Sequence, residues 1–226
     1  MRQEIFGLEL PELQRVLAEL GCKKFRAKQI YDWLYQKAVF NFSDMTNIGK
    51  AERELLESRL SILPAEIGVL RELNSSDGLT SKLLLKMPDG NAIETVLMHH
   101  DYGYSVCVSS QAGCDMHCAF CASGLNGAVR NLTLGEILAQ VYFFNARLMP
   151  KGERVSRVVV MGSGEPMLNF DAVFGALQFL HQPEVANMSY RNMTVSTCGI
   201  IPGIERMTAL GLPINLAISL HAVRQE

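Results

Sequence analysis

No stretch of the sequence is apolar for long enough to cross a bilayer, and no basic and apolar secretory signal follows Met1. These absences predict a cytoplasmic protein that makes no contact with a membrane. Because thiols stay reduced in the cytoplasm, the six cysteines are expected to be metal ligands or catalytic groups rather than disulfides. Two of them, Cys22 and Cys198, are predicted to be packing residues without a function.

The sequence also lacks an excess of charge of either sign. Its formal net charge is −2 and 19% of its residues are charged, which excludes a disordered chain and a protein that binds nucleic acid through overall positive charge. Any contact with RNA would have to come from local patches. With 226 residues, 48% of them hydrophobic, the chain has enough material for a sizeable core and one or two domains.

Residues 1–65 are predicted to form a small helical domain. Apolar residues recur at helical spacing between Pro11, a typical helix start, and Gly21, a typical helix stop. Further helices are expected at about 27–39 and 50–60, where the same spacing returns.

A basic turn lies between the first two of these helices. Residues 23–28 hold four cations and Phe25. A run of charge is usually a solvated surface, but an aromatic ring among cations also suits contact with RNA phosphates. The pattern alone leaves both interpretations open.

Residues 66–102 are predicted to form a β-hairpin extension. Strands are expected at 81–86 and 92–98, with Pro88-Asp89-Gly90 as the turn between them. Glu94 stands among apolar neighbours in the second strand. The alternation of side chains along a strand can place Glu94 on the solvent-exposed face of the sheet. Alternatively, Glu94 can point into a site and act as a base.

From about residue 103 the pattern repeats as strand, loop and helix. Thr133, with Glu136 three residues later, is a capping box for the first of these helices. Strands rich in Val and Ile that alternate with helices predict a parallel sheet buried on both faces. Ligands are expected at the carboxyl ends of its strands. The predicted strands are 105–109, 157–161, 193–196 and 215–220, and the predicted helices are 134–149, 171–180 and 202–210.

The most specific pattern in the chain is Cys114-x-x-x-Cys118-x-x-Cys121. Three thiolates can hold a four-iron cluster by three of its irons, which leaves one iron open to a small molecule, whereas electron-transfer clusters take four cysteines. A Cys3His zinc site that includes His117 is the alternative. However, His117 adjoins Cys118, so both would reach one ion poorly, and the second ligand pair of a zinc knuckle is missing downstream.

Polar and glycine-rich motifs follow the other predicted strands. Gly164 and Glu165 come after the second strand, and Glu165 offers a carboxylate to an ammonium group. Ser196 ends the third strand, and Ser219 and His221 lie at the end of the fourth. Each serine is a weak signal alone, since a serine at a strand end more often caps a helix. Because all these residues share one sheet edge with the cysteine loop, they predict a single site.

The longer motifs of the sequence resemble those of one family. The cysteine loop, the Gly-Glu-Pro motif and the strand repeat resemble the radical S-adenosylmethionine superfamily. More narrowly, they resemble its dual-specificity RNA adenine-C2 methyltransferases, which act on large-subunit ribosomal RNA and transfer RNA. The resemblance covers essentially the whole chain. It is carried by Cys107-Val-Ser-Ser-Gln-Ala-Gly-Cys114, Arg130-Asn-Leu, Met161-Gly-Ser-Gly-Glu-Pro166, Ser196-Thr-x-Gly199, Ile218-Ser-Leu-His-Ala222 and the Lys-Phe-Arg-Ala-x-Gln word of residues 24–29.

The resemblance implies an α/β fold in which residues 103–226 form a partial (β/α) radical-SAM barrel, with about four of the family's six units. It implies a four-iron four-sulfur cluster (4Fe-4S) and S-adenosylmethionine as cofactors, an electron donor such as flavodoxin, and a monomer. The cluster ligands would be Cys114, Cys118 and Cys121. The contacts of S-adenosylmethionine would be Gly164, Glu165, Ser196, Ser219, Leu220 and His221.

The resemblance also implies roles for two residues outside the strand-end motifs. Glu94 matches the proton acceptor of the family, and Cys107 matches a cysteine that helps to resolve a covalent enzyme–RNA intermediate. Adenine C2 is a poor nucleophile, so the family first methylates another of its own cysteines and then adds that methyl carbon to the ring. The methyl-carrying cysteine lies in a Cys-Gly-Gln-Leu-like segment that has no counterpart here. We therefore expect the sequence to be truncated and unable to complete methyl transfer alone.

Two other functions are considered beside this one. A relative that methylates adenine C8 and confers antibiotic resistance shares the cysteine loop and the helical region, but its Gly-Glu motif continues with Ala where this sequence has Pro166. The other is a non-enzymatic, zinc-stabilised RNA-binding module that would use the basic turn and the N-terminal helices.

Overall fold

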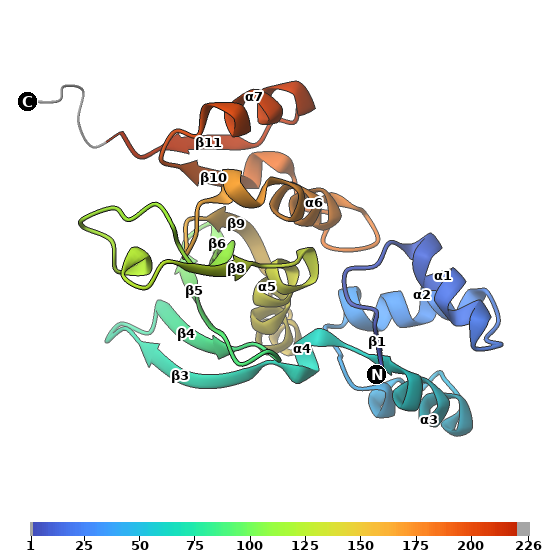
Figure 1. Cartoon of the computed structure of the whole chain (residues 1–226). Coiled ribbons are helices and arrows are strands. Elements are labelled where there is room, and N and C mark those ends of the chain that lie inside the picture. Colours follow the sequence, from blue (N-terminus) through green and yellow to red (C-terminus); the bar gives the residue numbers. More distant parts are fainter. Residues whose placement is uncertain (1, 221–226) are drawn as a thin grey trace, which may run out of the picture.

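A seven-stranded sheet forms the centre of the molecule (Figure 1). The structure is a computed structural model that describes residues 2–220. The order of strands across the sheet is β11-β10-β9-β6-β5-β4-β3. In chain order these strands are β3 (Gly68–Asn74), β4 (Thr80–Lys86), β5 (Ala92–His100), β6 (Gly103–Val108), β9 (Val155–Val160), β10 (Met193–Thr197) and β11 (Asn215–Ile218).

The sheet is parallel in one half and antiparallel in the other. β6, β9, β10 and β11 run parallel to one another, which confirms the four predicted strands of the strand–helix repeat. β5, β4 and β3 continue the sheet in antiparallel pairing, so the predicted hairpin is confirmed but joins the same sheet. β3 is a third strand that the sequence analysis did not predict. Between residues 2 and 220 the sheet stays open rather than closing into a full barrel.

Helices connect the parallel strands and pack on one face of the sheet (Figure 1). α5 (Leu134–Leu148) contacts β6 and β9 and packs beside α6 (Phe170–His181), and α7 (Ile201–Leu210) connects β10 to β11. The capping box at the start of α5 is confirmed, because Thr133 and Glu136 each accept a hydrogen bond from the other's backbone N–H. No helix within residues 2–220 is long and apolar enough to cross a membrane.

The two faces of the parallel strands differ in burial. Val106, Val108 and Val158 face the helices and are buried. Cys107 and Val159, which alternate with them, are only half-buried. The prediction of a sheet buried on both faces is therefore wrong for the part of the chain that the structure describes, because α5 and α6 lie on the same face.

The N-terminal region is a helical unit beside α5 and α6 (Figure 1). It contains α1 (Leu10–Glu19), α2 (Phe25–Tyr31) with its π-helical continuation η1 (Asp32–Gln36), and α3 (Lys50–Arg59). The three predicted helices are confirmed. The second ends at Gln36 rather than near residue 39 because Ala38 adopts a left-handed φ of 50°, which no helix can continue.

Short elements complete the chain. β1 (Gln3–Glu4) pairs in parallel with β2 (Leu60–Ser61), and β7 (Gln111–Gly113) pairs antiparallel with β8 (Ala128–Asn131). The remaining short helices are η2 (Phe42–Asp44), α4 (Leu63–Glu66), η3 (Ala122–Gly124), η4 (Met149–Lys151), η5 (Pro166–Asn169) and η6 (Tyr190–Asn192).

An aromatic cluster joins the helical unit to the helices of the sheet. The ring of Tyr35 lies 5.3 Å from that of Tyr142 on α5 and 5.2 Å from that of Phe179 on α6, and all three residues are buried. The Tyr35 hydroxyl accepts a hydrogen bond of 2.8 Å from the Gly7 N–H. Buried aromatic pairs stabilise packing beyond the area that they bury. The two parts of the chain therefore share one core.

We expect Tyr35→Ala to lower the free energy of unfolding by about 3–5 kcal/mol, because truncation of a buried aromatic side chain leaves a cavity. Tyr35→Phe should cost about 1–3 kcal/mol, because it leaves the Gly7 N–H unpaired. Urea unfolding measures both variants. Tyr102→Ala is the control: Tyr102 is 57% exposed, so its loss should cost less than about 1 kcal/mol. An effect of Tyr35→Ala as small as that of the control would contradict the shared core.

Candidate active site

The three cysteines of the sequence motif lie in a loop that closes on its own base. β7 and β8 pair as a hairpin, and the loop between them carries Cys114, Cys118 and Cys121. Gly113 begins the loop with a left-handed φ of 82°, and a Cβ at this position would lie 2.0 Å from the Gly127 carbonyl oxygen. A side chain at residue 113 would therefore collide with the opposite strand, and glycine allows the loop to close.

A cavity of ≈ 170 Å³ lies between this loop and the carboxyl ends of β9, β10 and β11. The structure brings these predicted residues together on its wall: Cys114, Cys118, Cys121, Gly164, Glu165, Ser196 and Ser219. The wall also contains residues that the sequence analysis did not assign to the site: Met116, Phe120, Ser123, Val160, Met161, Gly162, Pro166, Thr197 and Cys198.

Glu165 is a buried carboxylate on this wall. Its residue is only 3% exposed, and its two oxygens accept hydrogen bonds from the Met167 N–H at 3.0 Å and the Cys198 N–H at 2.9 Å. No lysine, arginine or histidine forms an ion pair with it in residues 2–220. A buried anion without a cation is costly, so this carboxylate favours a ligand that brings a positive charge into the cavity.

Cys198 is a fourth thiol on the same wall. Partial burial of the thiol and the adjacent Glu165 carboxylate raise the pKa of Cys198 to about 11. The prediction that Cys198 is a packing residue is wrong, because its side chain is exposed to the cavity rather than packed in the core. Cys198 lies just after β10, which ends at Thr197, so strand alternation does not indicate which way its thiol points.

Two family models match this chain. Residues 3–62 match the ribosomal RNA large subunit methyltransferase N-terminal domain, and residues 108–226, more than half of the chain, match the radical SAM superfamily. The chain belongs to the radical SAM superfamily. The cysteine hairpin and the strands that carry the cavity all lie within or directly beside the matched region.

Relatives within this superfamily align over the full chain. A protein of Symbiobacterium thermophilum named probable dual-specificity RNA methyltransferase RlmN is 46% identical over 227 residues, which cover 100% of this chain and 60% of the relative. A Bacillus cytotoxicus protein of the same name is 48% identical over 225 residues, covering 100% of this chain and 61% of the relative. The chain thus spans about three fifths of the length of these curated relatives.

A solved structure has the same fold. A radical SAM methyltransferase from Sphaerobacter thermophilus is 40% identical and superposes with a TM-score of 0.91, covering 97% of this chain and 64% of that one. The partial barrel implied by the sequence resemblance is therefore confirmed, with the open sheet described above.

Membership of the radical SAM superfamily implies a 4Fe-4S cluster and S-adenosylmethionine as cofactors. The residues present fit both. Cys114, Cys118 and Cys121 present their thiols on one wall, and each thiolate of such a cluster binds a different iron, so the thiols need a common wall rather than a common point. The buried Glu165 carboxylate suits the ammonium group of the methionine moiety.

The His117 ring is turned toward its own loop. The residue has a left-handed φ of 47°, and its Nδ1 lies 3.1 Å from the Gly124 carbonyl oxygen. In the described part of the chain, the cavity wall includes the three loop cysteines but not His117, and no three metal-binding side chains are grouped around one ion position. The loop geometry fits a cluster held by three cysteines.

Glu94 and Cys107 lie on one face of the sheet but not on the wall of the cavity, as far as residues 2–220 show. Cys107 is paired with Val96, and Glu94 is two residues from Val96, so both side chains project from the same face. Glu94 forms an ion pair of 2.7 Å with Lys82 on the neighbouring strand. Burial raises the pKa of the Cys107 thiol, so the thiol is protonated at neutral pH.

Two predicted contacts of S-adenosylmethionine lie at the end of the described chain. Leu220 follows β11 and is 64% exposed, outside the residues that line the cavity wall in the described range. His221 lies outside the described residues.

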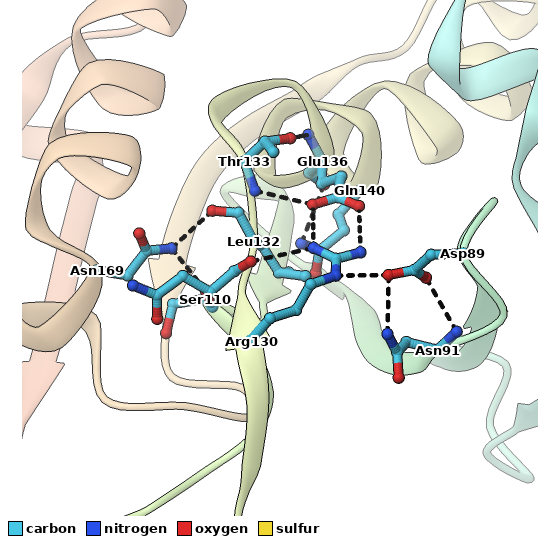
Figure 2. Close-up of polar contacts among 10 residues, drawn as sticks. Asp89, Asn91, Ser110, Arg130, Leu132, Thr133, Glu136, Gln140 and Asn169 are labelled. Carbon is cyan, nitrogen blue, oxygen red and sulfur yellow. Dashed lines mark hydrogen bonds and ion pairs between the residues drawn. The ribbon is translucent and has the colours of Figure 1, made fainter.

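Arg130 holds the base of the cysteine hairpin in place (Figure 2). From β8 its guanidinium donates two hydrogen bonds of 2.7 Å to Glu136 at the start of α5 and one of 2.5 Å to Asp89 in the β4–β5 turn. The sequence alone predicts a turn at Asp89 and a helix cap at Glu136, with no contact between them. Arg130 joins the two, so the hairpin is fixed to the β4–β5 turn and to α5 at once.

Buried amides hold the turn that precedes the hairpin (Figure 2). The Asn169 Nδ2 donates to the carbonyl oxygens of Ser110 and Leu132, both at 2.8 Å. The Gln140 side chain accepts from the Ser109 N–H at 2.8 Å and donates to the Ser109 carbonyl at 3.0 Å. Ser109 and Ser110 lie between β6 and β7 and Leu132 follows β8, so these bonds tie both ends of the hairpin to α5 and η5.

Gly113→Ala should reduce the iron bound after anaerobic reconstitution by several-fold, because the added Cβ would collide with the Gly127 carbonyl and distort the cysteine loop. Gly152→Ala is the matched control, since Gly152 also has a left-handed φ of 76° but has no atom within 4 Å of a Cβ. Both variants carry the same backbone strain, about 1 kcal/mol. Equal iron content in the two would contradict the steric account of the loop.

The Arg130 guanidinium holds the pKa of Asp89 well below its usual range. A carboxyl whose pKa is lower in the folded state stabilises the fold above its unfolded pKa of about 3.9 and loses this effect as the pH falls toward the folded value. We expect Asp89→Asn to cost less than about 1 kcal/mol at pH 7, because the Asp89 side chain is 39% exposed.

The loss of unfolding free energy caused by Asp89→Asn, relative to wild type, should become smaller as the pH falls below about 4. Urea unfolding across the pH range measures it. Asp171→Asn is the control, because its ion pair with Arg206 does not involve the hairpin and the Asp171 side chain is 87% exposed. If the loss of unfolding free energy in Asp89→Asn stays constant down to pH 2, this charge interaction is ruled out.

Proposed function

We propose that the chain belongs to a radical SAM methyltransferase that methylates C2 of a specific adenosine in large-subunit ribosomal RNA and in transfer RNA. The observation that carries this proposal is the cavity in which three cysteine thiols face a buried carboxylate without a cation. The match of residues 3–62 to a ribosomal RNA methyltransferase N-terminal domain supports RNA as the substrate, as do the names of the curated relatives.

The residues of the cavity have separate tasks in this proposal. Cys114, Cys118 and Cys121 hold the cluster by three of its irons. Glu165 accepts the ammonium group of S-adenosylmethionine, and Ser196 and Ser219 offer hydroxyls to its other polar groups. When bound, the two cofactors supply reductive cleavage of a carbon–sulfur bond, which a protein alone cannot provide.

The face of the sheet beside the cavity would receive the adenine. Glu94 accepts the proton from C2, and Cys107 resolves the covalent enzyme–RNA intermediate. The family's methyl-carrying cysteine lies in a Cys-Gly-Gln-Leu-like segment, which has no counterpart in residues 1–226. Because burial raises the pKa of the Cys107 thiol, the thiol has to lose its proton before it can act as a nucleophile.

The basic residues 23–28, expected from the sequence to form a turn, lie at and within the start of α2, and we propose that they contact RNA. Lys24, Phe25 and Lys28 are exposed, and Phe25 at 53% offers a ring face to an unstacked base. Arg26 serves a structural role instead, since its guanidinium pairs with Glu52 at 2.6 Å. The interpretation of the run as a phosphate-contacting surface therefore applies to the lysines. We also propose a cytoplasmic monomer that receives electrons from a donor such as flavodoxin.

Glu165→Gln should weaken binding of S-adenosylmethionine by about a hundredfold, because loss of one charge-assisted hydrogen bond costs about 1.5–3 kcal/mol. Equilibrium dialysis under anaerobic conditions measures the affinity, and iron content should stay unchanged. Glu153→Gln, at the far end of β9 where Glu153 accepts from the Tyr104 hydroxyl, is the control and should bind like the wild type. Unchanged affinity in Glu165→Gln would rule out the ammonium contact.

The regiochemistry is tested in cells. Deletion of the gene that encodes this chain should remove 2-methyladenosine from ribosomal and transfer RNA, as measured by chromatography and mass spectrometry of RNA digests. Loss of 8-methyladenosine instead would support the relative that methylates C8. If neither nucleoside changes, the proposed activity is wrong.

A further inference from the structure

We propose that Gln111 is a positioning residue that sets the separation between the cysteine loop and Glu165. This inference rests on the proposed cofactor site and identifies the residue that joins its two halves. Gln111 does not line the cavity within the described range, so it would act through the residues on either side of it.

One side-chain amide spans the two halves of the site. Gln111 is the first residue of β7 and is 4% exposed. Its Nε2 donates a hydrogen bond of 2.7 Å to the Asn131 side-chain oxygen on β8, the return strand of the cysteine hairpin. Its Oε1 accepts a hydrogen bond of 2.9 Å from the backbone N–H of Glu165. The amide therefore connects the base of the hairpin directly to the residue that carries the carboxylate.

Both partners of this amide are held by further contacts. The Asn131 Nδ2 donates to the Leu168 carbonyl at 3.2 Å, which leaves its oxygen directed at Gln111. A Cβ on Gly164 would lie 2.7 Å from both Cβ and Cγ of Gln111, so the Gly-Ser-Gly turn packs directly against this side chain. The arrangement leaves little room for Gln111 to adopt another rotamer.

The spacing matters because one ligand has to touch both halves. The amino acid portion of S-adenosylmethionine would bind the open iron and Glu165 at the same time. A bidentate ligand loses affinity when its two anchoring groups are displaced relative to each other by about 1 Å. A residue that fixes the two anchors should therefore change ligand affinity without touching the ligand.

The chemistry at position 111 requires a donor and an acceptor on one side chain. Glu at this position keeps an acceptor for the Glu165 N–H but presents a second acceptor to the Asn131 oxygen. Met has similar length and provides neither function. The two substitutions thus remove one half or both halves of the connection.

The test compares Gln111→Met and Gln111→Glu with wild type after anaerobic reconstitution. The readout is the concentration of S-adenosylmethionine that half-saturates the change in the electron paramagnetic resonance signal of the reduced cluster. We expect an increase of about tenfold in Gln111→Met, which loses both hydrogen bonds, and a smaller increase in Gln111→Glu, which loses one, with iron content as in wild type.

Asn145→Leu is the matched control. Asn145 is 1% exposed and accepts from the Val155 N–H at 2.8 Å, so the variant also leaves one buried N–H unpaired, but at the opposite end of β9. It should lose comparable stability and keep the wild-type half-saturation.

The positioning role would be overturned if the half-saturating concentration of S-adenosylmethionine in Gln111→Met equals that of wild type, or rises no more than in Asn145→Leu. The proposed function would be unaffected by that result. If Gln111→Met takes up no iron, Gln111→Glu decides: a raised half-saturation supports the role and a wild-type value overturns it. A wild-type protein that forms no cluster would overturn the proposed function, and the positioning role with it.

Discussion

The parallel register of β6, β9, β10 and β11 is the constraint on which the site depends. It brings the carboxyl ends of these strands to one edge of the sheet, so the loops that follow them must meet there. The cysteine hairpin follows β6, Glu165 follows β9, and Ser196 and Ser219 belong to the ends of β10 and β11. Segments as far apart in the sequence as Cys114 and Ser219 thus form one cavity.

Convergence alone would not hold the cysteine loop at a defined place. The loop is long and mostly irregular, and its order comes from the base of the hairpin rather than from its tip. Arg130 ties that base to Asp89 and Glu136, and Gln111 ties it to Glu165 (Figure 2 shows the Arg130 contacts). These bonds fix the base of the cysteine loop and the residue that carries the carboxylate to rigid elements, as a site for a chelating ligand requires.

The parts of this structure that could be predicted from the sequence are those set by local patterns. The strand–helix repeat, the capping box at Thr133 and the cysteine spacing each follow from residues that are close in the chain. The convergence of the strand-end motifs followed from the rule for parallel sheets.

The parts that could not be predicted depend on contacts between distant residues. Arg130 and Asp89 are 41 positions apart, and Gln111 and Glu165 are 54 apart, so no periodicity reveals either pair. Cys198 resembled a core cysteine because a single thiol after a strand carries no signal of what it faces. The partly open face of the sheet was missed because Val and Ile at alternating positions do not say how many layers of helix will cover them.

Mössbauer spectroscopy of the protein reconstituted with iron-57 tests the central claim most directly. The claim is that three thiolates leave one iron open beside the Glu165 carboxylate. Addition of S-adenosylmethionine should change the isomer shift of about one quarter of the iron and leave the rest unaltered. Four irons that all remain unchanged, or a protein that binds zinc in place of iron, would contradict it.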